Sequence, residues 1–172
     1  MTPENAKAAA EVIAQWWEGE FKATCQVIEA VKDDNRDYKP DPKSRTAWEL
    51  ATHIATADIW FLDCIINGAF AYNPEAAKAE EARFKTVADV VTFYKKAFPE
   101  KLNALRAVPA EKFTEVIDFF GFMKMPRANF VAMANNHSIH HRGQLAAYLR
   151  AHGSKVPNIY GPSADAVEAV IG

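Results

Sequence analysis

Two histidines four residues apart, His137 and His141, are the side chains of this sequence best spaced to act together on one ligand. Residues at positions i and i+4 lie on the same face of an α-helix, with their Cβ atoms about 5–6 Å apart. Two neutral imidazoles at this separation can bind one metal ion, as in zinc sites carried on a helix. A third histidine, His53, lies far upstream beside the apolar positions of another predicted helix. The spacing predicts a divalent metal site formed by all three, with hydrogen-bonded core histidines as the alternative.

The cost of burying imidazoles supports the metal site. Each buried ring needs hydrogen-bond partners, and three rings clustered on apolar helix faces satisfy one another poorly. A metal ion takes a lone pair from one nitrogen of each ring and leaves the other N–H for a nearby acceptor. Imidazole ligands suit several metals, and we expect zinc or nickel ahead of iron or copper, although the sequence does not separate them. Ser138 stands where a zincin protease has the glutamate of its HExxH motif, which excludes that function.

Four further residues are candidates to contact the ligands or a substrate: Glu49, Gln144, Tyr148 and Tyr160. Gln144 lies one helical turn after the histidine pair and could orient a ligand or bind substrate. Glu49 lies one turn before His53 and could accept its free N–H, but its position favours helix capping. Tyr148 could belong to the core instead. Tyr160 lies in the C-terminal tail, which could fold over an opening or lie on the surface.

Four long amphipathic helices are predicted to position these residues, because apolar side chains recur at steps of three and four. Their expected ranges are 3–32, 46–67, 86–108 and 126–152. Thr46 with Glu49, and Thr86 with Asp89, have the spacing of capping boxes, which mark helix starts. The last range carries the histidine pair on its apolar stripe. His140 is rotated away by about 100° and is expected to lie beside the site, outside the ligand set.

The remaining segments have weaker patterns. A short helix is expected to open at the Asn-Pro-Glu sequence of 73–75. His152 falls in the last turn of the last helix, where a cation favours the helix dipole. The stretch 113–125 is rich in aromatic residues and lacks a helical pattern, and Gly121 could allow a tight turn, so a small hairpin or an irregular loop is expected. Four of its side chains either cap the core or wall a ligand pocket or dimer contact: Phe119, Phe120, Phe122 and Met123.

These elements predict an all-α fold, a four-helix bundle forming a single domain over residues 1–172. The net charge of −2 argues against a nucleic-acid partner, which usually requires a basic face. No apolar run approaches the roughly 18 residues that span a bilayer. Because a signal-peptide pattern is also lacking, we expect a cytosolic protein with no membrane partner. Cys25 and Cys64 are predicted to be reduced core residues, with a disulfide or a reactive thiol as the alternative.

Three strings near the C-terminus resemble the signature of DinB-like (DinB/YfiT) proteins. They are HSIHHRGQL at 137–145, YLRAHG at 148–153 and VPNIYGP at 156–162. The string AWELATH at 47–53 resembles the second helix of that family. The C-terminal signature is specific, and the similarity in pattern extends over essentially the whole chain.

The resemblance implies a four-helix bundle with an up-down-down-up course and a divalent metal held by three histidines. The family's ligand positions correspond to His53, His137 and His141 in this sequence. The resemblance also implies a homodimer, to which Trp16, Trp48 and Trp60 could contribute, although tryptophans more often serve packing. Relatives of this family include metal-dependent thiol transferases and a mycothiol-dependent isomerase, and many members have no assigned activity.

Two functions are compatible with such a metal site. The first is a metal-dependent transferase or hydrolase-like enzyme acting on a small thiol or electrophile, since three protein ligands leave coordination positions open. The alternative is a non-catalytic metal- or ligand-binding stress-response protein, in which the ion braces two helices. A metal-free bundle with core histidines is the third reading. The substrate and a general base are not indicated by any motif.

Overall fold

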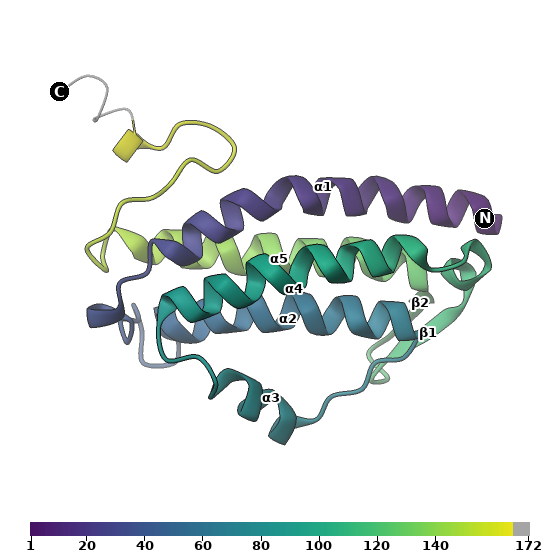
Figure 1. Cartoon of the computed structure of the whole chain (residues 1–172), viewed down its shortest axis with the longest axis horizontal. Helices are drawn as coiled ribbons and strands as arrows, with labels where there is room; N and C mark the ends of the chain where they lie inside the picture. Colours follow the sequence, from purple (N-terminus) through teal and green to yellow (C-terminus); the bar gives the residue numbers. More distant parts are fainter. Residues whose placement is uncertain (167–172) are drawn as a thin grey trace.

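Four long helices form the frame of the structure, a computed structural model that describes residues 1–166 (Figure 1). They are α1 (Pro3–Glu29), α2 (Ala47–Asn67), α4 (Val87–Ala107) and α5 (Arg127–Leu149). Figure 1 shows α1 and α5 running in one direction and α2 and α4 in the other, which confirms the predicted all-α four-helix bundle with an up-down-down-up course. The helices α2 and α1 each pack against both α4 and α5. Within residues 1–166 no helix combines the length and apolarity needed to cross a bilayer.

The connections carry short elements: η1 (Asp33–Asn35), α3 (Pro74–Glu81), η2 (Ala110–Thr114), β1 (Val116–Phe119) and β2 (Met123–Pro126). The strands pair antiparallel, with Ile117 opposite Met125. Phe120, Gly121 and Phe122 join them, and the first two have φ angles of 52° and 79°, in the left-handed region. The Phe122 N–H donates to the Phe119 carbonyl oxygen at 3.0 Å, which closes a tight turn. The predicted small hairpin before the last helix and the predicted short helix at 73–75 are therefore both present.

The helix starts follow the capping signals in the sequence. The Thr46 hydroxyl accepts a hydrogen bond from the Glu49 N–H at 3.0 Å, and the Glu49 carboxylate accepts one from the Thr46 N–H at 2.7 Å. Thr86 and Asp89 make the same reciprocal pair at the start of α4. These caps satisfy backbone donors that have no partner inside a helix, and so fix where α2 and α4 begin.

Two helix ends differ from the prediction. α1 ends at Glu29 and α5 at Leu149, each three residues before the expected position. His152 therefore lies in the turn after α5, buried, with its carbonyl oxygen accepting a hydrogen bond from Asn35 Nδ2 at 2.9 Å. Burial lowers the pKa of the His152 imidazole, so the expectation of a cation in the last helical turn is wrong.

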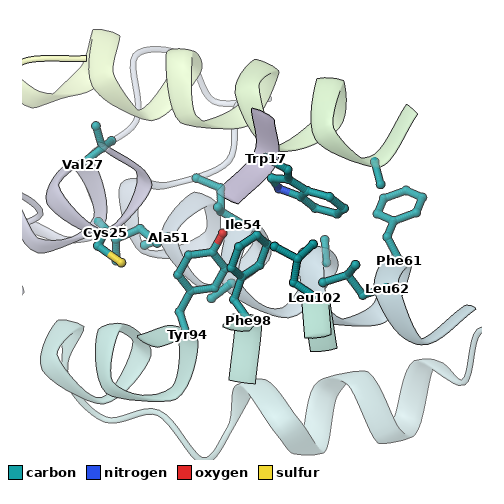
Figure 2. Close-up of a cluster of buried hydrophobic side chains, with 14 of the residues drawn as sticks. Trp17, Cys25, Val27, Ala51, Ile54, Phe61, Leu62, Tyr94, Phe98 and Leu102 are labelled. Atoms are coloured by element: carbon teal, nitrogen blue, oxygen red, sulfur yellow. The ribbon is translucent and has the colours of Figure 1, made fainter. Parts of the chain in front are cut away.

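Aromatic side chains fill the middle of the bundle (Figure 2). Trp17 packs edge-on against Phe98 with ring centroids 5.4 Å apart, and Tyr94 lies 5.1 Å from the same ring. Apolar side chains spaced three and four apart along α2 and α4 are buried: Leu50, Ile54, Ala57, Phe61, Ile65, Val87, Val90, Tyr94, Phe98, Leu102 and Leu105. Cys25 and Cys64 are free and buried, as predicted.

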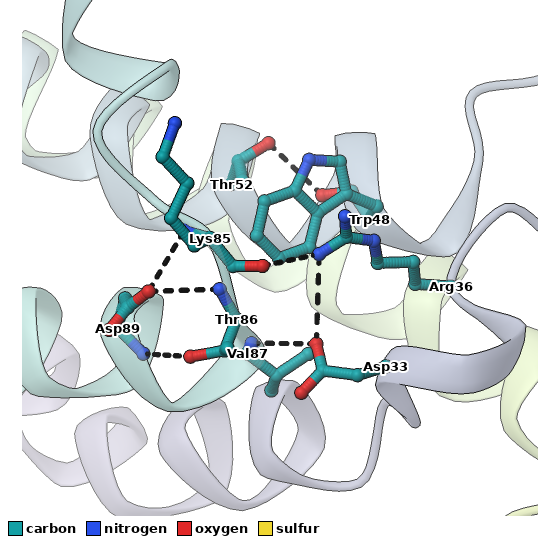
Figure 3. Close-up of polar contacts among 8 residues, drawn as sticks. All are labelled: Asp33, Arg36, Trp48, Thr52, Lys85, Thr86, Val87 and Asp89. Carbon is teal, nitrogen blue, oxygen red and sulfur yellow. Dashed lines mark hydrogen bonds and ion pairs between the residues drawn. The ribbon is translucent and has the colours of Figure 1, made fainter.

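Polar contacts join the α1–α2 connection to the start of α4 (Figure 3). The Val87 N–H donates to the Asp33 carboxylate at 2.9 Å, and Arg36 donates to the Lys85 carbonyl oxygen at 2.6 Å. The Arg36 guanidinium also lies over the Trp48 ring, 4.4 Å from its centroid. The α1–α2 and α3–α4 connections are thus joined at one end of the bundle, which fixes the helix that carries His53.

Candidate metal centre

Three histidines from two packed helices meet at one point inside the bundle. His53 comes from α2, and His137 and His141 come from α5. Their ring centroids lie 4.5–5.0 Å apart, and one nitrogen of each ring lies within 4.8 Å of the others. The Nε2 atoms of His53 and His137 are 3.3 Å apart. All three rings are half-buried, so solvent can still reach the point where their nitrogens converge.

The electrostatics of the three rings suit a metal ion. Burial is the largest cause that lowers the pKa of His53 to about 3 and of His137 to about 4, and it lowers that of His141 as well. The Arg45 guanidinium lowers the pKa of all three further, because a nearby positive charge disfavours imidazolium. The rings are therefore neutral near pH 7, which is the form that binds metals.

The hydrogen bonding of His137 also fits a metal. Its Nδ1 is buried and has no partner among residues 1–166, while its Nε2 faces the Nε2 of His53. Two neutral rings whose Nε2 atoms face each other either form one N–H···N hydrogen bond or carry both protons on Nδ1, and the second arrangement leaves both Nε2 lone pairs free for a metal ion. Three imidazole nitrogens at this spacing are a donor set that zinc, nickel, iron or copper accepts. The residues present fit a divalent metal.

Gln144 and Tyr148 connect to this centre. The Gln144 side-chain oxygen lies 3.1 Å from His141 Nδ1, and its amide nitrogen donates to the Tyr148 hydroxyl at 3.3 Å. An acceptor at Nδ1 places the His141 proton there and leaves the Nε2 lone pair available. This chain of contacts gives Gln144 the means to orient His141, and its role toward a ligand or substrate stays a prediction.

Glu49 and Tyr160 are placed differently. The Glu49 carboxylate caps α2, and no hydrogen bond joins it to His53 in the described part of the chain. Glu49 nevertheless lines the cleft beside the histidines. The Tyr160 hydroxyl accepts a hydrogen bond from buried Arg142 at 2.7 Å, while its ring is largely exposed. Tyr160 therefore packs on the outside of Arg142 and does not line that cleft.

His140 lies outside the cluster, as predicted. It is exposed, and its ring centroid is 4.8 Å from that of His141. It faces solvent because it is rotated by about 100° from the neighbouring ring on the same helix.

A buried polar network beside the histidines was not predicted from the sequence. The Asp58 carboxylate, fully buried on α2, accepts hydrogen bonds from the Tyr94 hydroxyl at 2.7 Å and the Ser138 hydroxyl at 2.8 Å. Asp58 stands one turn after Ile54 on the apolar face of α2, and a carboxylate at such a position is the signal that could have revealed it. The network joins α2, α4 and α5 next to His137.

A second buried polar residue follows the other histidine of the pair. Arg142 is 2% exposed and forms an ion pair with Glu20 of α1, with 2.5 Å between its nitrogen and the carboxylate oxygen. Ser138 and Arg142 are spaced like the histidines that precede them, so they form a second row on α5. One row presents imidazoles to α2, and the other ties α5 to α2, α4 and α1. The HSxxHR string therefore contains two histidines of the candidate site and the two polar residues, Ser138 and Arg142, that attach α5 to the other helices.

Replacing Asp58 with asparagine is expected to change how stability depends on pH. Burial raises the pKa of Asp58 to about 7, above the ordinary value of 3.8. The protonated carboxyl is thus favoured in the folded state, and its contribution is full below pH 4 and is lost as the pH rises through 7. The free energy of unfolding of the native protein relative to D58N should fall by on the order of 2 kcal/mol between pH 5 and pH 8. Urea unfolding of both proteins at the two pH values measures this, and an equal difference at both would contradict it.

A cleft of about 1010 Å³ opens from the histidines toward α3 and the hairpin. His53 and His137 line one part of it, and Trp60 and Phe119 line another. Of the aromatic residues at the hairpin, Phe119 thus walls a pocket, whereas Phe122 is 82% exposed at the turn. The centre is accessible through a cavity large enough for a small molecule.

Comparison with known sequences gives relatives over most of the chain. The uncharacterized protein YrdA of Bacillus subtilis is 25% identical over 152 residues, which cover 86% of this chain and 85% of YrdA. The uncharacterized protein YjoA of the same species is 29% identical over 133 residues, covering 76% of this chain and 82% of YjoA.

Solved structures show the same architecture. The crystal structure of YjoA, a DinB-like protein, superposes with a TM-score of 0.67 at 25% identity and covers 88% of this chain and 99% of that one. A DinB-like protein from Bacillus cereus superposes with a TM-score of 0.70 at 26% identity, covering 87% and 97%. The sequence profile of the DinB family matches residues 2–169. The chain therefore belongs to the DinB family.

Proposed function

We propose that this protein binds a divalent metal ion through His53, His137 and His141 and acts as a metal-dependent transferase or hydrolase-like enzyme on a small thiol or electrophile. The observation that carries the proposal is the convergence of three neutral imidazoles at the edge of a cleft of about 1010 Å³. A metal that only braced two helices would not need such a cavity beside it.

Each residue of the site has a defined part in this proposal. The three histidines would hold zinc or nickel, or else iron or copper, through their neutral nitrogens. Gln144 keeps the His141 ring in the orientation that directs a lone pair inward. When bound, such an ion supplies a positive charge that lowers the pKa of a thiol or water placed beside it.

The chain does not supply the thiol itself. Burial raises the pKa of Cys25 to about 11 and raises that of Cys64, so both stay protonated and are poor nucleophiles. Both are also buried away from solvent. The sulfur that reacts would therefore belong to a substrate that enters the cleft.

We expect protein purified without a histidine tag to turn over substrate only when metal is present. Conjugation of a low-molecular-weight thiol to a reactive acceptor should exceed the uncatalysed rate with one equivalent of zinc or nickel, and should fall to background after chelation. Metal content and turnover are measured on the same samples. Stoichiometric metal binding without turnover toward any acceptor would support the alternative function, a non-catalytic stress-response protein. Turnover that is unchanged after chelation would contradict a metal-dependent enzyme.

A homodimer in the cytosol completes the proposal. Trp16 and Val12 lie one helical turn apart on α1, with 67% and 52% of their surfaces exposed. This apolar pair suits contact with a second copy of the chain. The two free cysteines suit a reducing compartment. Light scattering after size exclusion measures the mass, and a monomer at micromolar concentration would remove the dimer from the proposal.

A further inference from the structure

We propose that the part of the cleft beyond the histidines, toward the C-terminal end of α2, is a subsite for a planar, uncharged aromatic group. This inference rests on the proposed function, because it assigns that group to the acceptor that receives the thiol. The subsite is the space walled by Trp60, Tyr72 and Phe119, with Ala77 of α3 on the opposite side.

The cleft follows one face of α2. Its lining residues on this helix recur at steps of three and four, so they lie along one line: Glu49, His53, Thr56, Trp60 and Asp63. His53 is the second residue of this line, one turn after Glu49. Trp60 stands about two helical turns beyond His53, or roughly 10 Å along the axis. An acceptor held beside Trp60 would thus present its reactive end toward the histidines.

The walls beyond the histidines are aromatic. The half-buried Trp60 ring lies 6.1 Å from Tyr72 and 6.5 Å from Phe119, in edge-to-face arrangements with both. Tyr72 is 59% exposed although it lines the cleft. Aromatic rings at these separations favour a further ring that packs face-to-edge or offset against them.

Several polar groups along the cleft are already paired within the protein. Thr52 and Thr56 donate to main-chain carbonyl oxygens of their own helix at 3.0 and 2.9 Å. The Trp60 indole N–H donates to a main-chain carbonyl oxygen at 2.7 Å. Lys101 and Asp63 form an ion pair at 2.6 Å. A polar or charged ligand would lose hydration here and gain few hydrogen bonds, so the occupant that fits is apolar.

The exposure of α3 also favours an apolar ligand in the subsite. Figure 1 shows it standing apart from the four long helices, and none of its residues is buried. Ala76 and Ala77 nevertheless face the cleft. An eight-residue helix gains little stability without packing of its apolar side. A flat apolar ligand between α3 and Trp60 would bury these alanines and complete the packing.

With an aryl halide as the acceptor, the reaction balances without another reactant. The sulfur of the thiolate attacks the ring carbon that bears the halogen, a carbon–sulfur bond forms, and the carbon–halogen bond breaks. The halide leaves with the bonding electron pair, and the thiol proton passes to solvent. The subsite would hold the ring while this exchange takes place at its edge.

A binding titration tests the subsite without any turnover. The fluorescent, uncharged arene N-phenyl-1-naphthylamine is added to metal-free and metal-loaded protein. W60A is expected to raise the Kd of the arene by at least about tenfold. A tenfold change in Kd corresponds to roughly 1.4 kcal/mol, which is the energy that one aromatic contact can contribute. A77F narrows the cleft from the opposite side and should weaken binding as much, without removing a packed residue. F122A, which removes an exposed aromatic outside the cleft, should bind as the native protein does. Equal binding by all four proteins would overturn the subsite.

A second measurement separates this inference from the proposed function. With metal present, W60A and A77F should raise the KM for 1-chloro-2,4-dinitrobenzene at least about fivefold more than the KM for iodoacetamide, an acceptor without a ring. Equal increases for both acceptors would overturn the aromatic subsite while the enzyme proposal stands. No turnover with either acceptor, together with arene binding that W60A and A77F weaken, would overturn the enzyme proposal and support the subsite.

Discussion

Alanine in place of His141 is expected to abolish stoichiometric metal binding. The variant keeps only His53 and His137, whose Nε2 atoms are 3.3 Å apart, and removes the third nitrogen of the cluster. Loss of an outer hydrogen-bond partner alone typically costs about 10–100-fold in metal affinity, so loss of a ligand should cost at least about 100-fold. Mass spectrometry of untagged protein after loading and dialysis measures the metal content. The value should fall from about one ion per chain to background.

His140 provides a matched control for this experiment. It precedes His141 on the same helix, is exposed, and lies outside the cluster. H140A removes the same number of atoms and should retain full metal content. Circular dichroism of both variants shows whether the helices persist. Full metal content in H141A would exclude His141 as a ligand, and equal loss in H140A and H141A would contradict a site confined to the three inner rings.

The frame of the bundle could be predicted because its signals are local. A capping box such as Thr46 with Glu49 involves residues three apart, and the stripe that contains Leu50 and Ile54 is read within one helix. Both depend on neighbours in the sequence, so no knowledge of the tertiary structure is needed. The ends of α1 and α5 were placed three residues too far because nothing in the apolar pattern stops at Glu29 or Leu149.

The inner histidines could be predicted for the same reason. His137 and His141 share a face by their spacing, and the apolar residues around them show that this face is turned inward. The partner helix was harder, because no local rule joins residue 53 to residue 137. The apolar surroundings of His53 made it a candidate, the resemblance to the DinB family assigned it to the same site, and the structure brings the rings together. Their role as ligands stays a prediction.

The second row on α5 could not be predicted by pattern. Ser138 and Arg142 are polar, and hydrophobic periodicity assigns polar residues to the solvent side. They can be buried because residues of other helices satisfy their polar groups. Asp58 accepts a hydrogen bond from Ser138, and Glu20 forms an ion pair with Arg142. Those partners lie 80 and 122 residues away in the chain, so only the folded structure reveals the pairing.

Removing Arg142 is therefore expected to destabilise the protein more than any change on the surface. Its guanidinium pairs with Glu20, donates to the Thr24 hydroxyl at 3.3 Å and donates to the Tyr160 hydroxyl at 2.7 Å. R142A would leave the Glu20 carboxylate, whose side chain is only 11% exposed, without its cation. Breaking a buried pair in this way typically costs about 3–5 kcal/mol, which corresponds to a fall in Tm of roughly 10 °C for a chain of this size.

Two comparisons show whether the buried ion pair causes this loss. R150A removes an arginine from α5's C-terminal end that is 56% exposed and pairs with Asp165 at 3.2 Å, and a surface pair of this kind contributes about 1 kcal/mol at most. The double variant with E20L and R142M removes both charges and should recover much of the stability, because no buried charge is then left alone. Thermal unfolding of the three proteins gives the answer. A Tm for R142A equal to that of R150A, or a double variant as unstable as R142A, would mean that the Arg142–Glu20 pair does not hold α5 against α1.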